Sequence, residues 1–576
     1  MADVSPFSLL VDELKTEDIE AKTRAIRKIK TVAAALGPDR TRDELLPLIN
    51  ESTDDEDEVL LLLAEQIGFL VDMIGGAAHV PKLLIPLEAL AAVEETVVRE
   101  KATESIAACI AAMDTADCGA VAQLVGRLAA GDWFTSRISA CSLVAPACAK
   151  CNEADQVQLR TIFASLSGDE TPMVKRAAAS QLGAFAQAVS KDVLLSEVVG
   201  IFSKQAKDDQ DSVRLLAIEA CVPVASLLSE AENEEHVLPI VHASVEDRSW
   251  RVRYNMAKMF HPLSAAMGTD ITMRDMLGSF LNLLQDAEAE VRTAATKNVA
   301  GYCELVGVEV FVQEVMPVLQ VLFTDTVQSV RTALSTAVMG VAGGGGFSQD
   351  LAGQHLVPLV SSFLRDESPE VRLNILKELS LLKDWIAAMQ DEIMPSVLQL
   401  VNDSHWRVRL AIVEQMPLFM GALGTPYFTS NLLPPLLATF GDTVAHVRVC
   451  SADMLAELAE AAGHDWIQAN VMPSLKESWE ASSYYLQRIT VLRSCEALAK
   501  AKVGGQLLND VTELVLKGLS DSVPNVRFSA CKTAETLVGI LEPAGVLPIK
   551  TKLEALTDDG DVDVVFYSRS AVEACS

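Results

Sequence analysis

Aromatic residues make up only 5% of this 576-residue chain, and features of several protein classes are missing from it. Basic residues are outnumbered, with 47 Lys and Arg against 79 Asp and Glu, and no basic block stands out. Because phosphate contact needs clustered Lys and Arg, we expect no nucleic-acid partner. Charges interrupt the apolar runs well before the roughly 20 residues that a membrane span needs, so we expect no membrane insertion.

The cysteines are odd in number, eleven in all, and irregularly spaced, which does not resemble a disulfide framework. Buried free thiols in a reducing compartment are the simpler interpretation. Residues 1–15 lack the basic start and the uninterrupted apolar stretch of a signal peptide. We therefore expect the protein to be located in the cytoplasm, and also in the nucleus.

Motifs for catalysis and cofactor binding are also missing. The acidic stretch 558–564 (DDGDVDV) lacks Gly at the sixth position of a calcium loop, and no Glu closes a twelve-residue loop from any of its aspartates. Residues 148–151 (CAKC) form a single cysteine pair, and residues 343–346 (GGGG) lack the Lys of a phosphate loop and are typical of a flexible hinge. The eight histidines do not cluster. We expect no cofactor, no metal site and no catalytic residue, so the chain is not predicted to be an enzyme.

What the chain does have is one repeat. A Val, usually followed by Arg, recurs at steps of 37 to 41 residues and marks fifteen units. The markers with the full pair are Val98, Val213, Val252, Val291, Val330, Val371, Val408, Val447 and Val526, and the equivalent positions without it are Glu20, Val59, Ser136, Val174, Leu486 and Val565. This regular step leaves almost no chain unaccounted for, so the repeat is the organising unit.

Two further residues keep the same period. An Asp lies five residues before the marker, at positions 54, 169, 208, 247, 286, 325, 366, 403, 442 and 521. A Pro recurs in the apolar run upstream, at positions 47, 86, 239, 317, 358, 395, 434 and 473. The prolines show the same long step followed by a short one that the valines show, so the repeat is not a chance pattern.

Each unit is predicted to be two antiparallel helices. The Pro should kink the first helix, and the Asp lies in the turn, where it can cap the second helix through its free amides. Such a small amphipathic pair cannot bury its apolar face alone, so neighbouring pairs must stack. The sequence therefore predicts an all-α protein, an elongated and curved right-handed solenoid of about fifteen repeats of roughly 39 residues.

The Arg that follows the marker lies six residues after the recurring Asp in most units. An Arg of one repeat that bonds the Asp of the next would fix how neighbouring repeats stack. Because the pattern appears in so many units, we interpret it as architecture and not as a binding site. The sequence therefore predicts a ladder of ion pairs along the chain.

Two turns carry a Trp-Arg pair directly before the Val-Arg marker, at Trp250 and Arg251 and at Trp406 and Arg407. The two tryptophans are 156 residues apart, which is four steps of 39. A turn has little core to fill, and Trp and Arg are the usual anchors of protein interfaces. We therefore favour partner binding over structural packing for these side chains, and packing stays open as the alternative.

The helix pairs with their Pro, Asp and Val-Arg marks resemble the HEAT-repeat family. Individual turns give a closer match: DELLPLI (43–49), DEDEVLLLLAEQIG (55–68), VEETVVREKA (93–102), GDWFTSR (131–137), TPMVKRAAAS (171–180), DQDSVRLLAIEAC (209–221), SWRVRY (249–254), PEVRLNI (369–375) and HWRVRLAI (405–412). These turns closely resemble those of the scaffold (A) subunits of serine/threonine protein phosphatase 2A. The resemblance covers the whole chain, including the number of repeats.

The resemblance implies a scaffold without catalysis of its own, in one continuous solenoid. Residues 1–400, repeats 1–10, would bind an interchangeable regulatory B-type subunit, and residues 401–576, repeats 11–15, would bind the phosphatase catalytic subunit. The implied regulatory-subunit surface comprises Glu94, Glu95, Trp133, Phe134, Glu170, Pro172, Met173, Lys175, Arg176, Trp250 and Arg251. The implied catalytic-subunit surface comprises Trp406, Arg407, His446, Tyr484, Tyr485, Arg488, Pro524 and Asn525.

Three stretches depart from the family pattern, and two other classes of protein compete with it. Lys175 stands where the family more often has Arg, and residues 482–488 and 341–346 also differ. Another HEAT-repeat adaptor, such as an importin-β-like transport receptor, is the main alternative, although such receptors are usually longer and carry an acidic insertion. A HEAT-like bilin lyase is the enzyme alternative, and those proteins are shorter.

Overall fold

The structure of the chain is a computed structural model that describes residues 6–388, 390–481 and 484–575. Within these ranges the chain is helical, without a strand, and the helices follow one another as fifteen pairs. The all-α fold of repeated helix pairs is confirmed. Among the described residues, none of the helices has the length and apolar character to cross a bilayer.

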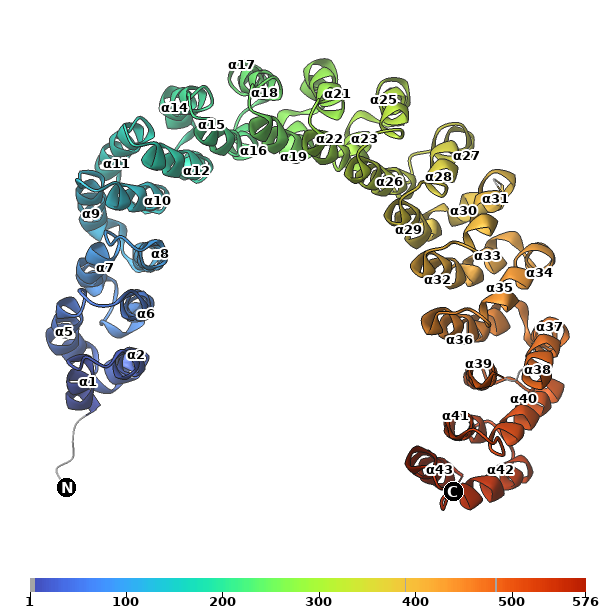
Figure 1. Cartoon of the computed structure of the whole chain (residues 1–576). Coiled ribbons are helices and arrows are strands. Elements are labelled where there is room, and N and C mark those ends of the chain that lie inside the picture. The colour runs from blue at the N-terminus through green and yellow to red at the C-terminus, as the bar shows by residue number, and fades with distance from the viewer. Residues whose placement is uncertain (1–5, 389, 482–483, 576) are drawn as a thin grey trace, which may run out of the picture. The chain divides into compact units, whose positions relative to one another are not determined.

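The chain divides into two compact units, Met1–Ala295 and Thr296–Ser576. Inside each unit the first helices of successive repeats form one layer and the second helices form another (Figure 1). In the first unit α9 contacts α11 while α8, α10 and α12 pack in sequence; in the second unit α36, α39, α41 and α43 do the same. The boundary at residue 295 is set by the packing of the helices. It does not test the predicted division of the chain at residue 400 by binding partner, which stays a prediction.

The first unit begins at the N-terminus and contains the following helices. They are α1 (Pro6–Leu14), α2 (Ile19–Ile26), α3 (Ile29–Leu36), α4 (Pro38–Arg40), η1 (Thr41–Leu45), α5 (Leu46–Glu51), α6 (Asp57–Gly68), η2 (Val71–Met73), η3 (Ala77–Leu83), α7 (Leu84–Leu90), α8 (Thr96–Ala112), η4 (Thr115–Asp117), α9 (Gly119–Ala129), α10 (Phe134–Lys150), α11 (Glu153–Ser167), α12 (Pro172–Ala188), α13 (Lys191–Val193), η5 (Leu194–Val198), α14 (Val199–Gln205), α15 (Asp211–Ile218), α16 (Cys221–Ala225), α17 (Glu230–His236), α18 (Leu238–Val245), α19 (Trp250–Met267), α20 (Thr269–Ile271), η6 (Thr272–Met276), α21 (Leu277–Leu284) and α22 (Ala289–Thr296), which ends at the boundary.

The second unit continues to the C-terminus in the same alternation. Its helices are α23 (Val299–Val306), α24 (Val308–Val310), η7 (Phe311–Val315), α25 (Met316–Leu322), α26 (Gln328–Gly343), α27 (Gln349–Leu351), η8 (Ala352–Leu356), α28 (Val357–Phe363), α29 (Pro369–Lys377), η9 (Leu379–Leu382), α30 (Lys383–Ile386), α31 (Gln390–Leu400), α32 (Trp406–Glu414), α33 (Met416–Leu423), α34 (Thr425–Asn431), α35 (Leu433–Thr439), α36 (Ala445–Ala462), α37 (His464–Asn470), α38 (Met472–Ala481), α39 (Tyr485–Lys500), α40 (Gly505–Gly518), α41 (Pro524–Val538), α42 (Pro543–Leu556) and α43 (Val562–Ala574).

The recurring proline breaks the first helix as predicted. Pro47, Pro317 and Pro358 each open a helix that directly follows a wider, π-helical turn. Proline has no N–H and its ring displaces the carbonyl one turn back, so a wider turn accommodates it. Two repeats contain the same wide turn, η5 and η6, with no proline in the helix that follows. The wide turn in the first helix therefore also arises where helix packing, and not a proline, produces it.

The marker valine is the core residue of each second helix. Val98, Val252, Val330, Val408 and Val526 are all buried, three residues after the N-cap of their helices. Each Å² of apolar surface that is removed from water on folding contributes about 25 cal/mol to the stability of the fold. The repeat period in the sequence is therefore the period at which one aliphatic side chain enters the core.

The spacing of three residues between N-cap and marker moves three of the predicted markers by one residue. In repeats 1, 13 and 15 the position three residues after the N-cap is Ala21, Gln487 and Val564, instead of the expected Glu20, Leu486 and Val565. In repeat 15, for instance, Val564 is buried and Val565 is only half-buried. These repeats lack a Val-Arg pair in register, so the sequence alone offered no anchor for counting.

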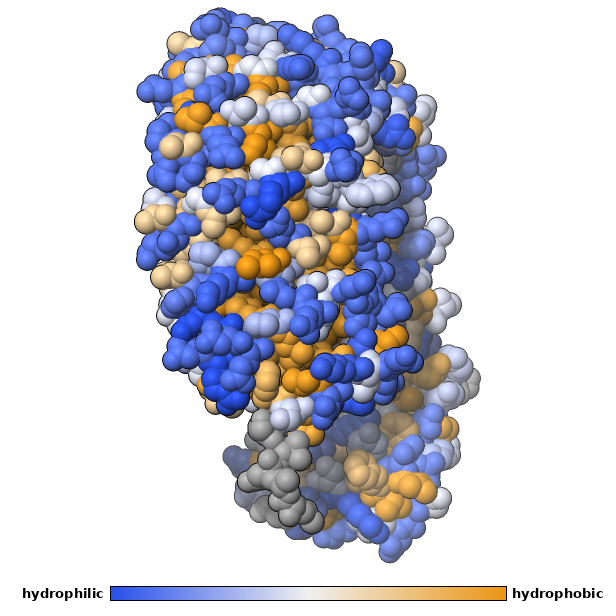
Figure 2. All heavy atoms as spheres, turned by 90° about the vertical axis from the view of Figure 1, so that its left-hand side faces the viewer, coloured by the Kyte–Doolittle hydropathy of each residue, from blue (hydrophilic) through white to orange (hydrophobic). Residues whose placement is uncertain are grey.

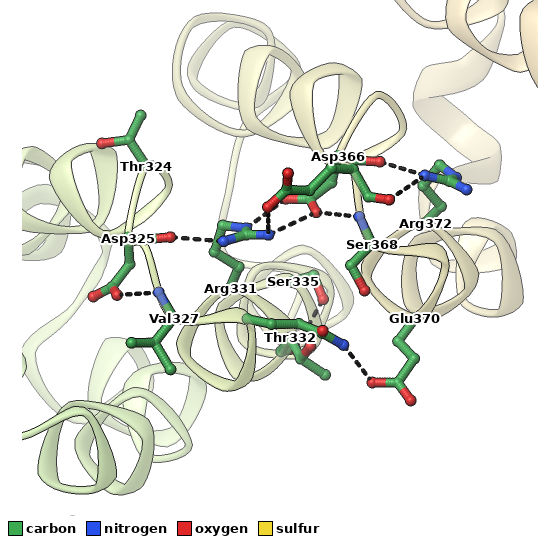
Figure 3. Close-up of polar contacts among 12 residues, drawn as sticks. Thr324, Asp325, Val327, Arg331, Thr332, Ser335, Asp366, Ser368, Glu370 and Arg372 are labelled. Carbon is green, nitrogen blue, oxygen red and sulfur yellow. Dashed lines mark hydrogen bonds and ion pairs between the residues drawn. The ribbon is translucent and has the colours of Figure 1, made fainter.

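The predicted ladder of ion pairs is confirmed, and Figure 3 shows one part of it. Arg331 Nε lies 2.8 Å from Asp366 Oδ2 of the next repeat, and its Nη1 donates to the carbonyl of Asp325 in its own turn at 2.7 Å. Other rungs include Arg137–Asp169, Lys175–Asp208, Arg214–Asp247, Arg253–Asp286, Arg372–Asp403, Arg409–Asp442, Arg488–Asp521 and Arg527–Asp559. Each rung therefore ties two neighbouring turns together.

The ladder Asp does not cap the second helix in the way that we expected. Asp169 Oδ1 accepts a hydrogen bond from the Thr171 amide at 2.8 Å, and Asp403 Oδ1 accepts one from the His405 amide at 2.7 Å. Thr171 and His405 are themselves the N-cap residues, because the Asp lies two residues before the cap. The carboxylate therefore fixes the turn that leads into the helix, as Asp side chains do in Asx turns.

Removal of one rung partner should destabilise the fold. In Asp442→Ala the Arg409 guanidinium, whose side chain is only 14% exposed, loses its carboxylate. Breaking a buried pair on one side costs about 3 to 5 kcal/mol, and partial exposure brings the expected loss of unfolding free energy to about 3 kcal/mol. Urea unfolding followed by circular dichroism measures it. Lys101→Ala, which breaks the more exposed pair with Glu104, should change the same free energy by less than about 1 kcal/mol.

The ladder should also respond to acid. The hydrogen bond from Arg409 lowers the pKa of Asp442, and the one from Arg527 lowers the pKa of Asp559. A carboxyl with a lowered folded-state pKa contributes its stability above the unfolded pKa of about 4 and loses it as the pH falls further. We expect the stability gap between the wild type and Asp442→Ala to be constant from pH 7 to pH 5 and to narrow below pH 4. A gap that stays constant down to pH 3 would contradict this role for Asp442.

Candidate protein-binding turns

The predicted site residues lie on one structural feature, the turn that enters each second helix. We call this feature the entry turn, and define it as the residues from the ladder position to the first turn of the second helix. In the first unit it leads into α8, α10, α12 and α19, and in the second into α32, α36, α39 and α41. Short turns of this kind present side chains away from the core, since the buried marker follows three residues after the cap.

Four second helices open with an aromatic residue at the same position. Phe134, Trp250, Trp406 and Tyr485 are the first residues of α10, α19, α32 and α39. A side chain two residues before the buried marker lies on the opposite side of the helix start, because each residue turns a helix by about 100°. The fold therefore offers one repeated position where a large ring can stand without entering the core.

Trp250 is half-buried and is held from two sides. The guanidinium of Arg251 lies over its indole ring, 5.1 Å from the centroid, and Tyr254 meets it edge-on with centroids 6.3 Å apart. Arg251 itself is exposed. A cation over an aromatic face is attracted by the ring quadrupole, so Arg251 both positions the ring and keeps N–H groups for a partner.

Trp406 has a similar arrangement in the second unit. Arg407 lies 4.7 Å above the ring, and the His446 ring of the next repeat lies 5.8 Å away at a tilt of 33°. The structure therefore brings together three residues that were predicted for one partner. His446 and Arg407 are exposed, so this cluster is accessible from solvent.

The remaining first-unit residues form a mixed apolar and acidic surface. Trp133 is 76% exposed at the N-cap of α10, and Met173 is 47% exposed, with the Nη1 atom of Arg176 at 3.8 Å from its sulfur. Glu94 and Glu170 are exposed, and Glu95 caps α8 by accepting from the Val97 amide. Pro172 opens α12, and Phe134 at the start of α10 is 38% exposed. Exposed rings among carboxylates suit a protein partner with apolar anchors and basic groups.

Two predicted contact residues are instead members of the ladder. The Lys175 ammonium lies 2.8 Å from Asp208, and Arg488 Nε lies 2.7 Å from Asp521. Both residues directly follow a marker position, and both are mostly covered. Their charges are therefore committed to stacking, and any contact that they make with a partner would involve the covered side of a rung.

The other second-unit residues lie at the entry turns of repeats 13 and 14. Tyr484 is exposed and its ring lies 5.9 Å from that of Tyr485. Pro524 opens α41, and Asn525 is exposed beside it. Ser482 and Ser483, part of the stretch that departs from the family pattern, lie outside the described residues.

Sequence reasoning missed an aromatic group on the last two repeats. Phe528 of α41 stacks on Tyr567 of α43 with centroids 5.7 Å apart, and the Lys532 ammonium lies 4.1 Å from the Tyr567 ring centroid. Phe566 is 66% exposed, and it lies two residues after its marker, as Phe528 and Tyr254 do. This shared position was a usable signal, but the one-residue error in repeat 15 concealed it.

The thiols of the chain are free and poorly reactive. Eleven cysteines are unpaired, and nine of them are buried. Burial raises the pKa of Cys148 and of Cys221 to about 12, so neither is a thiolate at neutral pH. In the described ranges, no three His, Cys, Asp or Glu side chains are grouped as a metal ion would need. The acidic stretch at 558–564 supplies Asp559, the ladder partner of Arg527.

Hydropathy over the surface agrees with a protein that binds by small anchors. On the face drawn in Figure 2, apolar residues lie in patches separated by hydrophilic ones. The chain carries a formal net charge of −32 at pH 7. A strongly charged surface steers association and rejects unsuitable partners more than it adds affinity.

Comparison with known proteins points to the same family that the sequence resembles. Residues 269–343 match the family described as PPP2R1A-like HEAT repeat. The chain is 40% identical over 384 residues to the beta isoform of the 65 kDa regulatory A subunit of serine/threonine-protein phosphatase 2A from Homo sapiens, covering 66% of this chain and 64% of that protein. It is 43% identical over 272 residues to the regulatory A subunit of protein phosphatase PP2A from Schizosaccharomyces pombe, covering 47% and 46%. These matches span less than two thirds of the length of either relative.

Solved structures with a similar fold include Kap95p, determined in a study of its binding to RanGDP. The similarity covers 100% of this chain and 84% of that one, with a TM-score of 0.59 and 12% sequence identity. At that identity the likeness establishes the fold alone. The sequence relatives carry the more specific information, because they are 40% and 43% identical to this chain over the matched stretches. The chain is therefore built of HEAT repeats, and its sequence is similar to those of the 65 kDa regulatory A subunits of serine/threonine protein phosphatase 2A.

Proposed function

We propose that this chain is a non-catalytic scaffold that assembles a phosphatase 2A catalytic subunit with a variable B-type regulatory subunit. The regulatory subunit binds the entry turns of the first unit, and the catalytic subunit binds those of repeats 11 to 15. The scaffold thereby controls which serine and threonine phosphates are removed. It acts in the cytoplasm and in the nucleus, and it has no phosphatase activity by itself.

One observation carries the proposal: a Trp with an Arg over its ring occurs at the same helix position in each unit. The Arg–ring distances are 5.1 Å at Trp250 and 4.7 Å at Trp406. Trp and Arg dominate the binding energy of protein interfaces when a partner pocket excludes water around them. Two separate anchors of the same design suit two different partners on one chain.

The environment of the two anchors differs, which supports different partners. Trp250 is accompanied by Tyr254 of its own helix, whereas Trp406 is accompanied by His446 of the next repeat. The first anchor is therefore contained within one repeat, and the second spans two. A partner pocket that fits one arrangement does not fit the other, so specificity follows from the neighbouring ring.

The test is a pull-down with two double variants, Trp250→Ala/Arg251→Ala and Trp406→Ala/Arg407→Ala. Truncation of a hot-spot residue weakens binding by about 2 kcal/mol or more, which is about 30-fold. We expect the first variant to lose the B-type subunit and the second to lose chiefly the catalytic subunit, with each captured protein quantified by mass spectrometry. Gln328→Ala is the matched control, because Gln328 opens α26 at the equivalent position but carries no ring.

Three results would contradict the proposal in different ways. If both double variants retain both partners at wild-type levels, the tryptophans are packing residues and the site assignment is wrong. If the wild type captures neither phosphatase subunit, the chain is another HEAT-repeat adaptor. If the purified chain alone removes phosphate from a phosphopeptide, it is not a non-catalytic scaffold.

A further inference from the structure

The rung that would start at Arg99 lacks its carboxylate. Arg99 follows the marker Val98 in α8, as every ladder Arg follows its marker, but the partner position in the next repeat is Gly131. In the part of the chain that the structure describes, Arg99 has no ion pair with Asp or Glu, although the residue is only 6% exposed. A covered guanidinium without a carboxylate is costly, because burial disfavours its charge.

The contacts of Arg99 show which half of the rung is missing. Its Nη1 donates to the carbonyls of Val93, at 3.0 Å, and Glu94 in its own turn, and its Nη2 donates to Thr96 Oγ1 at 3.1 Å. In a complete rung such as that of Arg137, Nε and Nη2 also contact both oxygens of the partner Asp, at 2.8 and 3.3 Å. Arg99 has kept the bonds within its turn and lacks only the bond to the neighbour.

Two substitutions in repeat 4 explain the gap together. A Cβ built on Gly131 would lie 2.2 Å from Ser136 Oγ, and that hydroxyl donates to the Trp133 carbonyl at 2.9 Å. Ser136 occupies the marker position, where most repeats have Val. The absent Asp and the altered marker therefore form one local arrangement, in which a serine hydroxyl takes the place of a ladder side chain.

A groove of about 230 Å³ opens beside Arg99, over the second helices α8, α10 and α12. Its hydroxyl groups include those of Thr103, Ser139, Ser142 and Ser180. Each of these hydroxyls donates to a carbonyl of its own helix, as Ser142 does to Ser139 at 2.9 Å. A hydroxyl rotates freely enough to donate to an incoming anion instead, so the groove can solvate a carboxylate.

We propose that an acidic side chain of the B-type regulatory subunit enters this groove and completes the rung on Arg99. This inference rests on the proposed function. The groove belongs to repeats 3, 4 and 5, whose entry turns carry the exposed Glu94, Trp133 and Met173. Glu100 also lines the groove, so a single negative charge is tolerated better than the double charge of a phosphate group. The ligand is therefore a carboxylate, and the guanidinium binds it through two parallel hydrogen bonds.

The decisive variant supplies the missing carboxylate from the chain itself, so that a partner can no longer pair with Arg99. Gly131→Asp/Ser136→Val recreates the residues of the complete rungs, so its own carboxylate should occupy Arg99. We expect a higher melting temperature than that of the wild type and about tenfold weaker binding of a purified B-type subunit, measured by biolayer interferometry. Catalytic-subunit binding should not change, because it uses the other unit.

A second pair of variants tests the charge of the groove without changing the ladder. Glu100→Gln removes the competing carboxylate, and we expect B-type subunit binding about threefold tighter. Lys101→Gln is its matched control, since it alters an exposed charge on the same helix outside the groove, and it should leave the affinity within about twofold.

The outcomes separate this inference from the proposed function. A wild-type chain that binds no B-type subunit would refute the proposed function and the inference with it. If the wild type binds and a stabilised Gly131→Asp/Ser136→Val binds equally well, the inference is wrong and the scaffold function stands. Should that double variant fold poorly, an affinity of Glu100→Gln equal to that of the wild type would by itself overturn the inference.

Discussion

The Arg–Asp rung is the interaction on which the rest of this structure depends. One guanidinium holds the backbone of its own turn and the carboxylate of the next, as Arg331 does with Asp325 and Asp366 (Figure 3). The same carboxylate also accepts a hydrogen bond from the N-cap amide that follows it. Turn geometry, helix start and repeat spacing are therefore set by a single contact, and the aliphatic core fills the space that this contact defines.

Much of the fold was predictable because repetition lets weak signals add. A single Val-Arg pair means little, but nine of them in register identify both the core residue and the ladder. At three of the six repeats without the pair, as at Leu486 and Val565, the predicted marker was off by one residue, since nothing local distinguishes neighbouring positions on a helix start. The wide turns of η5 and η6 were also beyond the sequence, because they arise from helix packing and not from a proline.

The site was predictable to a lesser degree. The entry turns were located correctly, and Trp406, Arg407 and His446 do lie together. Lys175 and Arg488, which are predicted for the partner surface, also belong to rungs. The sequence did not reveal this because a basic residue in a turn looks the same whether it is exposed or paired. Position relative to the marker distinguishes these residues. Lys175 and Arg488 directly follow the marker and pair with the next repeat, whereas Arg251 and Arg407 directly precede it and face solvent.

The contrast between covered rungs and exposed anchors has a consequence for how this protein responds to ions. The guanidinium of Arg214 and the carboxylate of Asp247 are almost covered, so mobile counterions have little access to them. Arg251 and Arg407, by contrast, stand in solvent, where charges are screened over about 8 Å at physiological ionic strength. If the proposed function holds, rising salt acts on assembly before it acts on the fold, and a concentrated salt wash removes partners while the helix pairs stay stacked.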